Sequence, residues 1–151
     1  MYREYLAKTM RLAVVVNPDA GLGGRLGFKG SDGRAAEARA AGAEDRAGPR
    51  MQQCLDRLSE LAREPIEILA WDGRMGGDWI PSEYTSTGKT PEVTDASSTS
   101  DFIKAHSPDL FLYAGGDGTT RDIVEALGER EIPLVGAVSY THLRAHETSE
   151  N

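Results

Sequence analysis

The sequence predicts an α/β fold in which helices cover both faces of a parallel sheet. Short apolar runs alternate with segments of helical periodicity along the 151 residues. These runs are apolar on both faces of the expected strand, as buried parallel strands are. Two of them end in glycine-rich turns, and ligands of such sheets bind beyond the carboxyl ends of the strands. The length suits one domain with its own core.

The first expected strand covers residues 12–16, a valine-rich run that Asn17 and Pro18 end. The next segment, 20–33, is dense in glycine, which favours a functional loop over a helix. Residues 35–46 are rich in alanine and allow a helix, although they lack a large apolar face.

A helix is expected over residues 50–64, because their apolar side chains share one face and Pro65 closes the segment. A second strand follows at 66–70. Residues 72–90 are rich in glycine, serine and threonine, so we expect them to be irregular and exposed. A brief strand is expected around 92–94.

The rest of the chain continues the alternation of helices and strands. Ser100 is expected to cap a helix that runs to about His106. Thr119 or Thr120 is expected to cap the next helix, which Gly128 ends. The strands that flank this second helix are residues 109–114 and 132–136.

A turn with the sequence Gly-Gly-Asp-Gly-Thr follows the strand at 109–114 directly. Gly115 and Gly116 have no Cβ, so the turn can approach a ligand closely. The following helix directs free amides and the positive end of its dipole into the same space. Asp117 is placed to accept a proton from a hydroxyl or to organise a metal ion. A tight turn with a solvated aspartate is the alternative, but the whole pattern favours a nucleotide or phosphoryl-transfer site.

A second glycine-rich loop follows the first strand. It begins at Asn17 and contains Gly21, Gly23 and Gly24. The loop is not a dinucleotide fingerprint, because the third glycine of that motif would fall at Leu26. Its amides can form a nest for phosphate, and a flexible surface loop is the alternative.

Three further features receive an ordinary structural interpretation. Residues 88–90 resemble the end of a P-loop, but Glu83 stands where the first glycine must be, so we expect a surface turn. His106 is expected to be solvated or to cap its helix. Trp71 and Trp79 are expected to pack in the core or to anchor a loop.

The composition limits the partners. The net charge is −7 and the basic residues form no run, so we expect neither a nucleic acid nor an anionic membrane as a partner. Cys54 is the single cysteine, which fits a reducing, cytoplasmic setting. We find no signal peptide and no apolar stretch of bilayer length. A nucleotide remains a possible ligand, since amides and a metal ion can hold phosphate on an acidic protein.

The C-terminal segment differs from the rest. Residues 138–148 resemble the conceptual translation of a sequencing adapter. We therefore expect the native domain to be residues 1–137 and the segment 138–151 to be a non-native tail. His142 and His146 lie within this tail, so their spacing is assigned no metal chemistry.

The glycine–aspartate turn after an apolar strand resembles the signature of the NAD kinase and diacylglycerol kinase superfamily. The first glycine loop, together with residues 29–33, 71–77 and 94–95, narrows the resemblance to the ATP-NAD kinase-like family. It covers about residues 11–137. The resemblance implies a Rossmann-like N-terminal domain similar to that of phosphofructokinase, followed by a β-rich domain with no counterpart in this chain. We therefore expect an N-terminal fragment that is inactive alone.

The resemblance also implies an activity. It is the phosphorylation of the 2′-hydroxyl of NAD to give NADP, with ATP or polyphosphate as donor and a divalent metal ion such as Mg²⁺. Asp117 would be the catalytic carboxylate. The nucleotide and phosphate site would be shaped by Asn17, Gly21, Gly23, Gly24, Gly115, Gly116, Gly118 and Thr119.

Some features of this activity remain open at the level of the sequence. No residue is assigned as a metal ligand. The partner is expected to be a nucleotide, and the resemblance implies a homo-oligomer. A diacylglycerol or sphingoid kinase of the same superfamily and a nucleotide-sensing module without turnover are the two alternatives.

Overall fold

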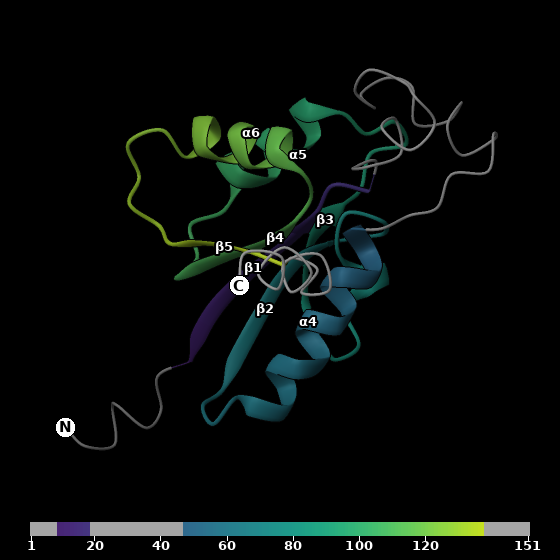
Figure 1. Ribbon diagram of the computed structural model, residues 1–151, viewed down its shortest axis with the longest axis vertical. Coiled ribbons are helices and arrows are strands. Elements are labelled where there is room, and N and C mark those ends of the chain that lie inside the picture. Colours follow the sequence, from purple (N-terminus) through teal and green to yellow (C-terminus); the bar gives the residue numbers. More distant parts are fainter. Residues whose placement is uncertain (1–8, 19–46, 138–151) are drawn as a thin grey trace, which may run out of the picture.

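The computed structural model describes residues 9–18 and 47–137. These segments form a five-stranded sheet with the order β3-β2-β1-β4-β5, and all of its pairings are parallel (Figure 1). The strands are β1 (Met10–Val16), β2 (Ile66–Asp72), β3 (Thr85–Lys89), β4 (Leu110–Ala114) and β5 (Leu134–Gly136).

Helices cover both faces of this sheet. α4 (Ala47–Leu61) packs on one face, and α5 (Ala96–Ala105) and α6 (Asp117–Leu127) lie together on the other (Figure 1). A short 3-10 helix, η1 (Gly77–Trp79), belongs to the loop after β2. The predicted α/β fold is therefore confirmed. None of the helices in the two described segments is long and apolar enough to cross a bilayer.

β1 is the central strand and is buried on both faces. Its last five side chains are each at most 1% exposed, because alternate side chains enter two different cores. Leu12, Val14 and Val16 face α4. Ala13 and Val15 face α5 and α6. Burying one valine or leucine side chain contributes roughly 1.5–3 kcal/mol, so this strand stabilises the packing of helices on both faces of the sheet.

α4 begins earlier than the predicted helix at 50–64. Gly48 is already helical and buried, and a Cβ at this position would collide with the indole of Trp79. That indole donates a hydrogen bond to the Arg74 carbonyl at 2.8 Å, so Trp79 anchors its loop, as expected. Met51 and Leu55 provide the buried face of α4, as the apolar spacing predicts.

α5 begins four residues before the predicted cap, Ser100. The N-cap is Asp95, whose carboxylate accepts hydrogen bonds from the amides of Ser97 and Ser98 at 2.9 and 3.3 Å. The Ser98 hydroxyl in turn accepts from the Asp95 amide at 3.2 Å, which completes a capping box. Ser100 is helical, so the prediction of its role is wrong. The serines and threonines after Asp95 offered several possible caps, but the structure uses the aspartate that precedes them.

We expect Asp95→Ala to lower the free energy of unfolding by about 1 kcal/mol, because the first turn of α5 loses its cap. The Ser97 hydroxyl holds the pKa of Asp95 below its ordinary value. A depressed folded pKa stabilises the fold above the unfolded pKa, and this contribution disappears as the pH falls through the folded pKa. Urea titrations at pH 7 and pH 3 measure both effects, with Asp95→Asn as the variant that retains a cap. An unchanged midpoint for Asp95→Ala at pH 7 would contradict the assignment.

The region after β2 is more ordered than predicted. β3 lies within residues 72–90, which we expected to be irregular, and no strand is found at 92–94 in this described part of the chain. β3 is a sheet edge with mostly exposed polar side chains, so it lacks the apolar run that marks a buried strand. Gly88 lies within β3, so the surface turn expected there is also wrong.

His106 is buried rather than solvated. It is 8% exposed and stacks on Phe102 with ring centroids 4.1 Å apart. Nδ1 lies 2.6 Å from the Phe102 carbonyl oxygen, and Nε2 lies 2.7 Å from the Thr87 hydroxyl. A carbonyl oxygen only accepts, so Nδ1 donates in the contact with Phe102. Its place as the C-cap of α5 is confirmed. Trp71 packs edge-on against Phe102 at 5.2 Å, as a core role requires.

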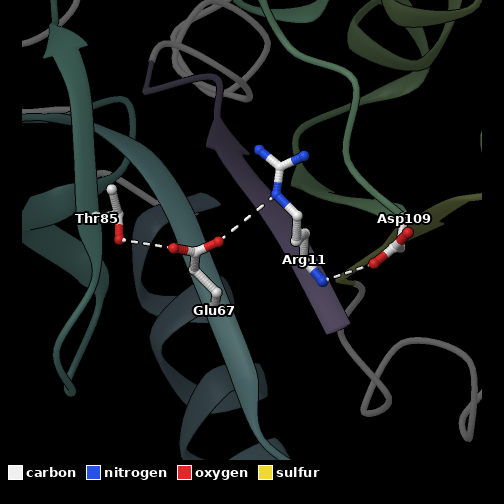
Figure 2. A network of polar contacts seen from close by, with 4 residues as sticks. All are labelled: Arg11, Glu67, Thr85 and Asp109. Carbon is white, nitrogen blue, oxygen red and sulfur yellow. Dashed lines mark hydrogen bonds and ion pairs between the residues drawn. The ribbon is translucent and has the colours of Figure 1, made fainter. Parts of the chain in front are cut away.

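Polar contacts at the amino end of the strands join segments that are far apart in the sequence (Figure 2). Arg11 Nε lies 3.5 Å from a carboxylate oxygen of Glu67, whose other oxygen accepts from the Thr85 hydroxyl at 3.4 Å. The Arg11 amide donates to the Asp109 carboxylate at 2.8 Å. Partly exposed ion pairs of this kind contribute at most about 1 kcal/mol, so these contacts help to set strand register rather than to hold the sheet together.

Candidate functional site

The two predicted glycine loops begin side by side at the carboxyl edge of the sheet. Val16 is in register with Ala114, and the Asn17 amide donates to the Ala114 carbonyl at 2.9 Å. From this point β2 and β3 extend the sheet in one direction, and β5 extends it in the other. The direction in which successive strands are added to the sheet therefore reverses at the boundary between β1 and β4. Such a switch point is where open α/β sheets bind their ligands.

The side chain of Asn17 reaches the glycine–aspartate turn. Its Nδ2 donates to the Thr119 hydroxyl oxygen at 2.9 Å, across 102 residues of sequence. Thr119 is 4% exposed and belongs to the first turn of α6. The structure thus brings together two of the residues that the sequence assigned to the site. Gly21, Gly23 and Gly24, also assigned to it, lie outside the described residues.

Thr120 makes a second contact on the same turn. Its hydroxyl lies 2.6 Å from the hydroxyl of Tyr113 in β4, and it donates to the Gly116 carbonyl at 3.3 Å. The Thr120 amide donates to the same carbonyl at 3.1 Å. The contact of Tyr113 with this turn could not be predicted from the sequence, because Tyr113 lies inside an apolar run that is typical of a buried strand.

The glycines of the turn fall into two groups. A Cβ added to Gly115 would collide with the side chain of Thr119, so this glycine is required by the packing of the protein itself. A Cβ added to Gly116 or Gly118 would meet nothing within 4 Å. Neither has a positive φ, so their backbone conformations also suit other residues. These two glycines leave their backbone open to the outside, where a ligand can approach it.

Asp117 is exposed and is the first residue of α6. The N-cap is Gly116, without a side-chain cap, so Thr119 and Thr120 do not cap this helix as expected. The first amides of a helix have no acceptor within it, and the positive end of the dipole adds to their attraction for anions. At the other end, Gly128 stops α6 with a φ of 60°, as predicted.

The loop after β2 borders the same edge. The Val16 amide donates to the Met75 carbonyl at 2.8 Å, and the Met75 amide donates to the Thr90 hydroxyl oxygen at 3.0 Å. The Tyr84 hydroxyl donates to the Asp72 carboxylate at 2.6 Å. This bond lowers the pKa of Asp72 and raises the pKa of Tyr84. The Tyr84–Asp72 hydrogen bond joins the last residue of β2 to the end of the loop that leads to β3.

In the ranges that the structure describes, no three histidine, cysteine, aspartate or glutamate side chains gather as a ready-made metal site. In nucleotide enzymes, Mg²⁺ is held mainly by substrate phosphates and by one or two carboxylates. Asp117 is the exposed carboxylate of the turn and fits that role.

The fold and this edge define an α/β domain of the nucleotide-binding type, with an open glycine turn and one carboxylate at the switch point. The family described as "ATP-NAD kinase N-terminal domain" matches residues 12–143. The chain therefore belongs to the ATP-NAD kinase family, and its match is to the N-terminal domain. No curated protein and no solved structure matches it in the corresponding comparisons.

Proposed function

We propose that this protein is an NAD kinase that transfers the γ-phosphate of ATP, or a phosphate of polyphosphate, to the 2′-hydroxyl of NAD. The observation that supports this most directly is the first turn of α6. It combines an exposed carboxylate at Asp117 with the open backbone of Gly116 and Gly118, at the switch point of the sheet. The match to the ATP-NAD kinase N-terminal domain supports a nucleotide as the ligand of this turn.

Phosphoryl transfer depends mainly on positioning and on electrostatic stabilisation. Asp117 accepts the proton of the attacking ribose hydroxyl, or orients that hydroxyl, while the new phosphorus–oxygen bond forms and the bond from this phosphorus to the leaving ADP or shortened polyphosphate breaks. The amides of the first turn of α6 donate hydrogen bonds to phosphate oxygens. Mg²⁺, when bound, would neutralise charge on the donor phosphates. Gly116 and Gly118 allow the phosphate to come close, because no side chain covers the backbone there.

We further propose that a β-rich domain completes the cleft, as the resemblance implies. The sheet edge described here supplies one wall, formed by the loops after β1, β2 and β4. The 151-residue chain alone is then expected to bind a nucleotide without transferring a phosphate.

The test is an assay of NADP formation. The 151-residue chain and a longer form that carries a β-rich second domain are incubated with NAD, ATP and Mg²⁺, and NADP is measured with an NADP-specific dehydrogenase. We expect NADP from the longer form only. Phosphorylation of diacylglycerol in place of NAD would overturn the proposal in favour of a lipid kinase. Binding of NAD with no phosphorylation by the longer form would overturn it in favour of a sensing module.

A further inference from the structure

We propose that Asn17 and Tyr113 are positioning residues that set the direction of Asp117 through Thr119 and Thr120. This inference rests on the proposed function for its catalytic part. Its structural part concerns the first turn of α6 alone and is tested independently.

The turn needs support from outside because of its own composition. Glycine occupies positions 115, 116 and 118, and glycine restricts the backbone less than any other residue. The helix that follows begins without a side-chain cap. The local sequence therefore restrains this turn only weakly, whereas a catalytic carboxylate must be held in one direction.

The first support comes from β1. Asn17 Nδ2 donates to Thr119 Oγ1 at 2.9 Å, and the Asn17 amide is itself held by the Ala114 carbonyl. The Thr119 side chain packs under Gly115, in the space that a Cβ there would occupy, and is almost fully buried. Thr119 thus joins the end of the central strand to the start of α6.

The second support comes from β4. The Tyr113 hydroxyl lies 2.6 Å from the Thr120 hydroxyl, which also donates to the Gly116 carbonyl. The Tyr113 ring packs closely over Gly136 of β5, where an added Cβ would lie only 3.0 Å from the ring. The backbone carbonyl of Tyr113 accepts a hydrogen bond from the Ala137 amide at 2.8 Å. This tyrosine is therefore fixed to β5 as well as to α6.

The two supports act from different sides of the helix. Consecutive residues of an α-helix point about 100° apart, because a turn contains 3.6 residues. Contacts through Thr119 and Thr120 therefore both oppose rotation of the first turn of α6 about the helix axis. Asp117 is two residues before Thr119 on the same turn, so the direction of its Cα–Cβ bond is set once this rotation is fixed.

The structural part of the test measures amide hydrogen exchange at Thr120, whose amide bonds to the Gly116 carbonyl. We expect Tyr113→Phe and Thr119→Val each to speed this exchange about fivefold, as expected for the loss of one hydrogen bond. Thr119→Ser retains the hydroxyl and is expected to exchange as the wild type does. Tyr84→Phe is the matched control, since it loses a 2.6 Å bond to Asp72 but does not touch α6.

The catalytic part is measured on the longer, two-domain form. We expect Tyr113→Phe to lower kcat about tenfold. KM for NAD is expected to change by less than about twofold, and the melting temperature by no more than a few degrees. Thr85→Val, which loses its 3.4 Å bond to Glu67 at the amino end of the strands, is expected to leave kcat unchanged. Unchanged exchange at Thr120 in both Tyr113→Phe and Thr119→Val would overturn the proposal. Faster exchange with an unchanged kcat would overturn the positioning role. A wild type that forms no NADP refutes the proposed function, whereas the exchange data still decide whether the turn is held.

Discussion

Gly118→Ala is expected to weaken nucleotide binding at least about tenfold without harming the fold. The added Cβ meets no protein atom within 4 Å, so it projects into the space where phosphate would approach the amides of α6. Within a helix, alanine is favoured over glycine by up to about 1 kcal/mol. The variant is therefore expected to be as stable as the wild type or slightly more stable, which separates loss of binding from loss of structure.

Gly115→Ala is the matched comparison. Its Cβ would collide with the side chain of Thr119, so we expect a loss of about 1–3 kcal/mol in the free energy of unfolding. Calorimetric titration with ATP and Mg²⁺, together with urea denaturation, measures both properties for each variant. Wild-type affinity in Gly118→Ala would show that the open side of the turn is not the ligand side.

Asp117→Asn is expected to lower the kcat of NADP formation by about 10²–10⁴, the usual contribution of a general base. The substitution keeps the shape of the side chain and removes its charge and its ability to accept a proton. Asp117 is exposed, so we expect the free energy of unfolding to change by no more than about 0.5 kcal/mol.

The measurement is NADP formation by the two-domain form, with ATP affinity determined in parallel. Asp101→Asn is the matched control, because Asp101 is an exposed carboxylate on α5, outside the turn. Turnover by Asp117→Asn at the wild-type rate would refute the role of this carboxylate. A loss of turnover in both variants would point to a general effect of charge instead.

The parts of the fold that could be predicted are those whose signal is local. β1 and β4 are apolar on both faces because the sheet buries both of their faces, and that pattern is visible in the sequence. β3 was missed because an exposed edge strand needs no apolar residues. The buried state of His106 was missed for a different reason, since its partners in β3 and α5 come together only in the folded chain.

The candidate site divides in the same way. The glycine turn and Asp117 could be found from five consecutive residues. The role of Thr119 could not, because a threonine after Gly-Asp-Gly reads as a helix cap, whereas its hydroxyl accepts from Asn17 at the end of another strand. The distinction between Gly115 and Gly118 was also out of reach, since it depends on what fills the space beside each backbone.

The position of β1 in the sheet has a consequence for how the protein folds. This strand pairs on one side with β2 and on the other with β4, whose residues lie about one hundred positions later in the chain. Contacts at such sequence separation slow folding, because the entropy of closing the loop is lost before the contacts form. During synthesis, one edge of the most apolar strand therefore stays unpaired until β4 has left the ribosome. An open apolar edge is prone to pair with other chains, so early arrest of translation is expected to yield an aggregating species.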